Sequence, residues 1–268
     1  MIHWSERDGW AHFYRYNNQG KLLNRITKGS FHSDYIKHYD EKSKNLFFTA
    51  HGVNNQIDPY YEHTYKVSLN GGVPKLLNKG NFNTMTYPSD NHRYFVNNFS
   101  RVNTAPESHL INSDGTVIMK LEKADLSALF ESGYQFPETF KAKADDGITD
   151  LYGVIYKPFD FDENKKYPLL EYVYPGPQTE SVNKSFSVRM DRLDRMAQLG
   201  FIVITLGNRG GHPDRSKWYH NYGYGNLRDY GLARYLPILN LSQSLEEFND
   251  KKTELQYEFS RFFRHQNL

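Results

Sequence analysis

The sequence contains no cysteine among its 268 residues, which excludes disulfide bonds and thiolate metal sites. No apolar run approaches the roughly 20 residues that a helix needs to cross a bilayer. The first seven residues have neither a basic start nor an apolar stretch, so we expect no signal peptide there. The 33 basic and 31 acidic residues are scattered, and without a basic cluster nucleic acid is not an expected partner.

Aromatic side chains, by contrast, are abundant. They make up 16% of the sequence, with 21 Tyr and 18 Phe. Aromatic and β-branched residues suit pleated, half-buried surfaces, so this composition favours β structure. The length is sufficient for one large domain or two modest ones with a buried core.

The first half of the chain contains an internal repeat. His12 and His63 begin the first two copies, which are 51 residues apart, and a weaker third copy contains His109. Each copy has a strand-like stretch, a tight turn rich in Asn, Asp or Gly, and a second strand, at 12–16, 18–20 and 22–23, at 63–67, 70–72 and 76–77, and at 108–111, 113–115 and 117–119.

Further short strands are expected at 46–50 and 94–98, between the copies. Four strands per unit of about 40–50 residues is the period of a β-propeller blade. Two or three blades cannot close a ring, which usually needs at least about four, so we expect an incomplete propeller. The alternative is a small meander or sandwich of unrelated hairpins.

The pattern changes after Lys123. A short linking helix is predicted at 125–130 with Asp125 as its cap. An antiparallel hairpin is expected from 140–144 and 151–156, with its turn at Gly147.

A strand, a helix and another strand are predicted next. The first strand covers 169–174, and the helix covers 186–199 and ends at Gly200. The continuous apolar run at 201–206 is typical of a strand covered on both faces. Together with the hairpin, this order predicts an α/β sheet with an antiparallel leading edge.

Four motifs in consistent order carry a family resemblance that covers residues 3 to about 233. Residues 4–14, with Ser-Glu-Arg-Asp-Gly-Trp at 5–10, resemble a blade signature of dipeptidyl peptidase IV-like proteins in the prolyl oligopeptidase family. Tyr-Val-Tyr-Pro-Gly-Pro-Gln at 172–178 resembles the first core strand and turn of their hydrolase domain. Residues 207–211 and 225–231 are similar to the next turn and to the helix entry before the nucleophile strand.

The resemblance implies a mixed β and α/β fold, in which a partial β-propeller of the last two to three blades precedes an incomplete α/β-hydrolase domain. It places the propeller blades at 1–123, a linker at 124–136, the start of the hydrolase (peptidase) domain at 137–233 and a divergent helical tail at 234–268. The family reaction is release of N-terminal dipeptides from peptide substrates, usually after Pro or Ala. The resemblance also suggests a periplasmic or extracellular location and allows a homodimer in full-length relatives.

One catalytic residue is implied by the resemblance. Tyr174 takes the position of the tyrosine whose hydroxyl helps form the oxyanion hole, where a fixed donor stabilises the charge of the tetrahedral intermediate. On residue type alone, in a chain with 21 tyrosines, an aromatic packed at a strand end explains Tyr174 better, and only the family context favours the oxyanion role. Arg209 and Asp229 are interpreted as structural residues that tie loops together.

The catalytic serine, acid and base are missing. An α/β-hydrolase presents its serine on a Gly-x-Ser-x-Gly elbow, and this chain has none. Ser242, Ser244 and Ser260 are the serines after residue 233, and none has a glycine neighbour. We therefore expect a truncated peptidase that is inactive alone, with a tail that departs from the family pattern.

Two alternatives stay open. One is a non-catalytic module that binds or scaffolds through its propeller and sheet surfaces. The other is metal chemistry through some of the 11 histidines, of which His212 and His220 are the closest pair in the second half. Eight residues without a carboxylate pattern is not a ligand spacing, so no metal and no cofactor are predicted.

Overall fold

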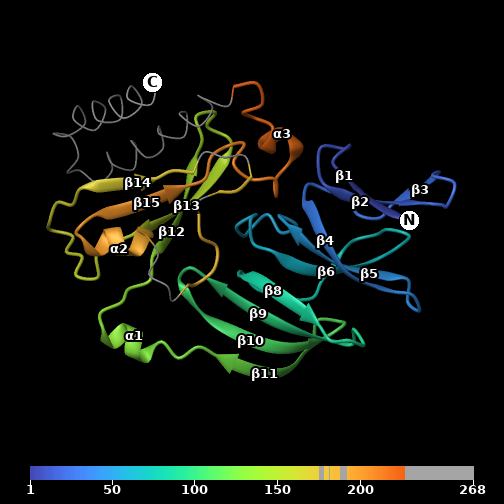
Figure 1. Cartoon of the computed structure of the whole chain (residues 1–268), viewed down its shortest axis with the longest axis horizontal. Helices are drawn as coiled ribbons and strands as arrows, with labels where there is room; N and C mark the ends of the chain where they lie inside the picture. Colours follow the sequence, from blue (N-terminus) through green and yellow to red (C-terminus); the bar gives the residue numbers. More distant parts are fainter. Residues whose placement is uncertain (175–177, 181, 188–191, 227–268) are drawn as a thin grey trace.

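The computed structural model describes residues 1–174, 178–180, 182–187 and 192–226. Three antiparallel sheets come first in the chain, and a mixed sheet with a short helix against it follows (Figure 1). The predicted tail at 234–268, the helix-entry motif from 227 onward, including Asp229, and the Pro-Gly-Pro break at 175–177 lie outside the described residues.

The three antiparallel sheets follow one another along the chain, each as a meander. Their strands are β1 (Ile2–Ser5), β2 (His12–Tyr16) and β3 (Leu22–Arg25); β4 (His32–Asp40), β5 (Asn45–His51), β6 (His63–Ser68) and β7 (Lys75–Leu76); and β8 (Asn83–Pro88), β9 (Tyr94–Arg101), β10 (Thr104–Asn112) and β11 (Val117–Lys123). The strands predicted from the repeat are thus confirmed.

The sequence repeat has a matching repeat of hydrogen bonds. His12 Nε2 lies 3.1 Å from the carbonyl oxygen of Gly29, and His63 Nε2 lies 3.1 Å from that of Gly80. Both glycines have positive φ angles, 139° and 137°. The repeated histidines are therefore structural, because each one holds the glycine turn that follows the next strand of its own sheet.

The sheets pack face to face through alternating side chains of β5. Its even-numbered residues Leu46, Phe48 and Ala50 join a core with Phe13 and Ile26 of the first sheet region. Phe47 points to the other side, where it packs with Leu77, Phe95 and Ile111. Strand side chains alternate between faces, so one central strand contributes to both cores. This is why β5 is apolar on successive positions.

The mixed sheet has the order β12-β13-β15-β14. Its elements are β12 (Glu138–Lys143), β13 (Asp150–Tyr156), β14 (Leu169–Tyr172), α2 (Arg192–Gln198) and β15 (Ile202–Leu206). β12 and β13 pair antiparallel, whereas β14 and β15 pair parallel. The predicted hairpin and the strand–helix–strand unit are both confirmed.

β15 is buried at all five positions, as its apolar sequence predicted. Val203 packs towards Leu193 and Ala197 of α2, and Ile202 and Ile204 belong to the core on the other face. A strand covered on both faces has no polar side to present to water, which explains its continuous apolar run.

Two helix predictions need correction. The linking helix α1 spans Ser127–Glu131, and its N-cap residue is Leu126 rather than Asp125. Asp125 Oδ1 still accepts a hydrogen bond from the Ser127 N–H, one position before the cap. The second predicted helix was too long at its start, because residues 186 and 187 are not helical. It ends as predicted at Gly200, whose φ is 94°.

A search for long apolar helices among the described residues finds none of the length and hydropathy that a membrane span requires.

Candidate functional site

A cavity of about 600 Å³ lies between the first two sheets and the mixed sheet. Its walls combine aromatic side chains and two arginines with small, polar and acidic residues, and Trp10, Tyr152, Arg209, Arg215 and Trp218 are among them. Aromatic walls with a few fixed polar groups are typical of binding sites for small molecules and peptides. The residues come from both halves of the chain, so the cavity depends on how the halves dock.

A buried carboxylate network forms one side of this junction. Tyr60, in the loop between β5 and β6, donates a hydrogen bond of 2.6 Å to Glu180 Oε1. The hydroxyl of Tyr219, from α3 (Lys217–His220), lies 3.1 Å from the same oxygen and 3.0 Å from the carbonyl oxygen of Asn208. Burial raises the pKa of Glu180 above its ordinary value. The Glu180 carboxyl therefore links three segments of the chain, although its burial opposes folding.

A second polar contact crosses the same junction. Lys184 Nζ lies 2.7 Å from Asp58 Oδ2, and both side chains are largely buried, with 15% and 16% exposed. The ammonium group also lies 4.7 Å from the centre of the Tyr60 ring. A half-desolvated ion pair with a cation–π contact is stronger than an exposed pair. Both partners belong to segments that the sequence did not single out.

Arg209 has the structural role predicted for it. Its guanidinium group lies 2.6 Å from Asp145 Oδ1 and 2.9 Å from Asp146 Oδ2. The two acids form the turn of the β12–β13 hairpin, so Arg209 ties the loop after β15 to that turn. Hydrogen bonds from Thr149 and Ile148, together with Arg209, lower the pKa of Asp146 to about 2.

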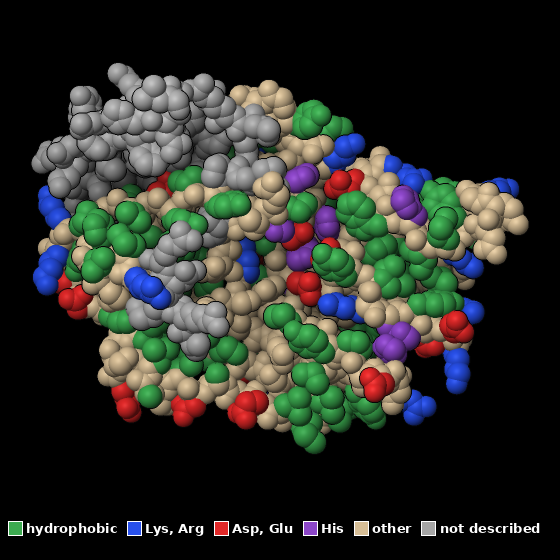
Figure 2. All heavy atoms as spheres, viewed as in Figure 1, with side chains coloured by type: hydrophobic (Ala, Val, Ile, Leu, Met, Phe, Trp, Pro, Cys, Tyr) green, Lys and Arg blue, Asp and Glu red, His purple; other side chains and the backbone are tan. Residues whose placement is uncertain are grey.

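Histidines and acids gather at the mouth of this junction. Figure 2 shows several histidine side chains close to acidic ones near the middle of this face. His51 Nε2 lies 3.6 Å from Asp34 Oδ2 and 3.7 Å from Asp214 Oδ2. His212 Nδ1 lies 3.0 Å from Asp214 Oδ2, and His32 Nε2 lies 3.9 Å from Asp214 Oδ1.

The charge states within this cluster differ. Burial lowers the pKa of His32 to about 4, so this ring is neutral near pH 7. Burial acts in the same direction on His51, but the facing carboxylates of Asp34 and Asp214 outweigh it and raise the pKa of His51. A hydrogen bond from His212 holds the pKa of Asp214 below its ordinary value despite burial.

His212 and His220, which the sequence had rejected as a ligand pair, have different surroundings in the structure. His212 joins the acid–histidine cluster through Asp214, whereas no ion pair of the described residues includes His220. Sequence reasoning missed the cluster, because its members come from the ends of separate strands and from a distant loop. A high histidine count was the only signal, and it carries no positional information.

Tyr174 lies two residues beyond the end of β14 and its side chain is 44% exposed. Among the described residues its hydroxyl has no hydrogen-bond partner. The strand predicted at 169–174 was therefore two residues too long at its end, and the Tyr174 phenol is accessible.

The similarity to known proteins follows the fold just described. A family model named "Dipeptidyl peptidase IV (DPP IV) N-terminal region" matches residues 1–106. Human dipeptidyl peptidase 8 is 30% identical over 184 residues, which are 60% of this chain and 20% of that protein. A probable dipeptidyl-aminopeptidase B of Tuber melanosporum (strain Mel28) is 27% identical over 240 residues, 83% of this chain and 25% of its own length.

These matches support a dipeptidyl peptidase IV-like family for this chain. The crystal structure of Porphyromonas gingivalis dipeptidyl peptidase 4 superposes with a TM-score of 0.72 at 26% identity, over 88% of this chain and 33% of that one. A putative dipeptidyl aminopeptidase IV from Bacteroides ovatus shares the fold, with a TM-score of 0.76 at 24% identity, over 91% of this chain and 37% of that one. The partial propeller followed by an α/β sheet is therefore the fold of this chain, which spans a fifth to a quarter of the curated relatives named above.

Proposed function

We propose that this chain is the propeller and sheet part of a serine exopeptidase of the dipeptidyl peptidase IV type, and that it is inactive by itself. The observation that carries the proposal is the single alignment with a dipeptidyl peptidase 4 structure through both halves of the chain. The family reaction, release of N-terminal dipeptides usually after Pro or Ala, comes with this assignment. Its domains are assigned as blades at 1–123, a linker at 124–136 and a hydrolase segment at 137–233.

Tyr174 is assigned to the oxyanion hole of the assembled enzyme. Its position just beyond a core strand and its accessible hydroxyl support this role, because the donor must reach the substrate carbonyl. No residue of this chain is assigned as the nucleophile. The sequence has no Gly-x-Ser-x-Gly, and a serine outside such a turn is not presented above the sheet.

The first test is hydrolysis of Gly-Pro and Ala-Pro chromogenic dipeptides by the purified chain, together with a serine-directed fluorophosphonate label. We expect no turnover above the buffer rate and no labelled band. A full-length dipeptidyl peptidase at the same molar concentration is the positive control. Turnover with a labelled Ser242, Ser244 or Ser260 would disprove the inactivity.

A second candidate function is a non-catalytic binding module, and the aromatic cavity at the junction favours it. Such a module should be monodisperse, whereas an open fragment should self-associate through its sheet edges.

The edge strand β11 favours self-association, because all seven of its residues are exposed. Four of them are large and apolar: Val117, Ile118, Met119 and Leu121.

We therefore expect Ile118→Lys to increase the monomeric fraction in size-exclusion chromatography with light scattering. A charge on an edge strand disfavours pairing with another edge. Val73→Lys is the matched control, because Val73 is 93% exposed but lies in the β6–β7 turn. Equal effects of the two substitutions would show that general solubility, and not the edge, controls association.

A further inference from the structure

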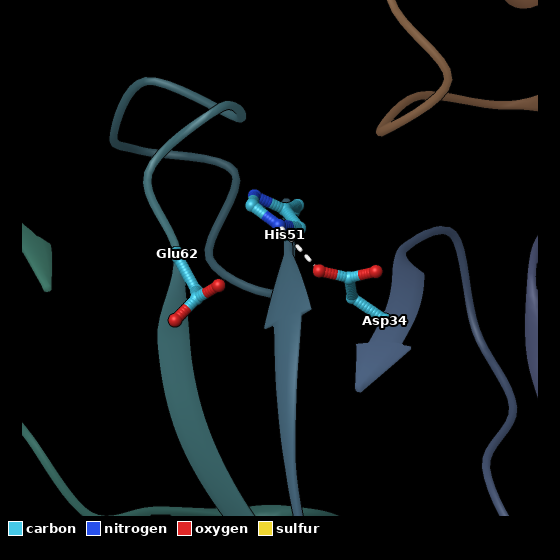
Figure 3. Close-up of side chains that lie close together, drawn as sticks. All are labelled: Asp34, His51 and Glu62. Carbon is cyan, nitrogen blue, oxygen red and sulfur yellow. Dashed lines mark ion pairs between the residues drawn. The ribbon is translucent and has the colours of Figure 1, made fainter. Parts of the chain in front are cut away.

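Three ligand-type side chains meet at one end of the second sheet. Asp34 belongs to β4, His51 is the last residue of β5, and Glu62 directly precedes β6. One donor atom from each of them lies within 4.8 Å of the other two. Figure 3 shows the three side chains converging from their neighbouring strands.

The backbone explains why Asp34 turns towards the other two. β4 and β5 pair regularly at His32 and Ser33, but the register shifts between Ser33 and Ile36. Such an irregularity re-aims the side chains at its position and often lies beside a functional site. The shifted segment is fixed by a hydrogen bond from the Tyr35 N–H to Thr49 Oγ1.

Glu62 is held equally firmly. Its N–H donates to Asn83 Oδ1 at 2.8 Å, and its carbonyl oxygen accepts a 2.6 Å hydrogen bond from Thr84 Oγ1. Both partners belong to β8 of the next sheet. The acid therefore has a fixed backbone, as a preformed ligand needs.

The orientation of His51 is that of a metal ligand. Its Nδ1 lies 3.3 Å from the carbonyl oxygen of Tyr60, so this nitrogen carries the proton. Histidines that bind metals commonly donate the second ring N–H to a backbone carbonyl, which leaves the other nitrogen for the ion. Here the other nitrogen, Nε2, faces Asp34 and Asp214.

The site is rich in carboxylates. Asp34, Glu62 and Asp214 bring three carboxylates around one imidazole that is 6% exposed. His212 pairs with Asp214 at 3.0 Å. This leaves Asp34 and Glu62 as the carboxylates available to a cation beside His51. Partly desolvated carboxylates are costly unless they are paired or bound to a metal. We propose that Asp34, His51 and Glu62 bind a divalent transition-metal ion of the Zn²⁺ class, with Asp214 adding negative charge beside them.

The donor set selects this class of ion. One imidazole nitrogen with two carboxylates suits Zn²⁺ and neighbouring transition metals, whereas sites for Ca²⁺ and Mg²⁺ consist of oxygen ligands. The ion would stabilise the end of the second sheet beside the loop that carries Asp214. This inference does not depend on peptidase activity.

The test uses the tag-free full chain after dialysis against a chelator. Zn²⁺ is titrated in competition with a chromophoric chelator, and Co²⁺ is added separately to read the visible absorption of the bound ion. We expect one Zn²⁺ per chain with micromolar or tighter affinity and a higher melting temperature when Zn²⁺ is saturating. Asp34→Asn, His51→Gln and Glu62→Gln should each weaken binding by about tenfold or more.

His109→Gln is the matched control. His109 Nε2 also faces a carboxylate, Glu107 Oε2 at 3.5 Å, but no third ligand of the described residues joins this pair. The His109→Gln variant should bind Zn²⁺ with the same affinity as the unmodified chain. The ligand substitutions are close in size to the native side chains, and circular dichroism verifies that each variant is folded. Failure of the unmodified chain to bind, or unchanged binding in all three ligand variants, would overturn the proposal.

Discussion

Gly115→Ala should lower the free energy of unfolding by about 3 kcal/mol or more. Gly115 has a φ of 83°, a conformation that costs an alanine about 1–2 kcal/mol. Its added Cβ would lie 2.9 Å from Leu77 Cα and closer still to the Leu77 carbonyl oxygen. Because that neighbour is the backbone of the preceding sheet, neither side can move freely.

The internal repeat supplies the control. Gly20 occupies the equivalent turn of the first sheet with a φ of 77°, and a Cβ there meets nothing within 4 Å. Gly20→Ala should therefore cost only about 1 kcal/mol, from backbone strain alone. Gly71 should fall between the two, since its Cβ would lie 3.1 Å from the Arg25 carbonyl oxygen.

The measurement is urea unfolding followed by far-UV circular dichroism, with the midpoints compared at a common slope. Equal losses of unfolding free energy in Gly115→Ala and Gly20→Ala would mean that backbone strain alone determines the destabilisation. The packing of each turn against the sheet before it would then be unimportant. An ordered series from Gly20 through Gly71 to Gly115 would show that close packing between blades makes these glycines necessary.

Tyr60→Phe should destabilise the chain by about 2 kcal/mol, the size of a hydrogen bond to a charged group. The substitution removes the hydroxyl that donates to Glu180 and leaves that buried carboxyl with one donor fewer. Glu180 Oε2 already lacks a hydrogen-bond partner among the described residues, so it cannot compensate.

The neighbouring tyrosine is the control for this change. Tyr61 is as buried as Tyr60, with 5% and 6% exposed, but no described residue accepts a hydrogen bond from its hydroxyl. Tyr61→Phe should change the free energy of unfolding by less than about 0.5 kcal/mol. Similar costs for the two variants would show that the bond to Glu180 contributes nothing specific.

The cost of Tyr60→Phe should also grow with pH. Burial raises the pKa of Glu180 in the folded chain, so its ionisation opposes folding, and stability falls as the pH rises from the unfolded pKa through the raised one. The Tyr60 hydroxyl favours the ionised form. Its loss raises the pKa of Glu180 further and adds a penalty only above the pKa of the unmodified chain. Unfolding at several pH values checks this, and a pH-independent difference would contradict it.

Several polar contacts at the junction involve one end of the second sheet. Tyr60, Asp58 and the cluster around His51 all lie at one end of the second sheet, and their partners come from residues 180–219. That end of the propeller part is therefore the surface on which the mixed sheet docks. Changes there should affect both halves of the chain together.

The sequence by itself determined the local elements. Turn glycines and alternating apolar residues were sufficient for the hairpins of the three sheets, because those signals act over a few residues. The apolar run at 201–206 predicted a doubly covered strand for the same reason, and β15 is buried at all five of its positions. Signals at element ends were weaker, so the cap of α1 and the start of α2 were misplaced by one or more residues.

Only the tertiary structure decided which side chains meet. Asp34, His51 and Glu62 have no ligand spacing along the chain, and a shift of strand register together with three adjacent strand ends brings them together. Glu180 became a buried acid because Tyr60 and Tyr219 approach it from segments 120 and 39 residues away. Spacing in sequence encodes neighbours on one element, whereas a site built from several elements depends on packing between sheets, which no local pattern records.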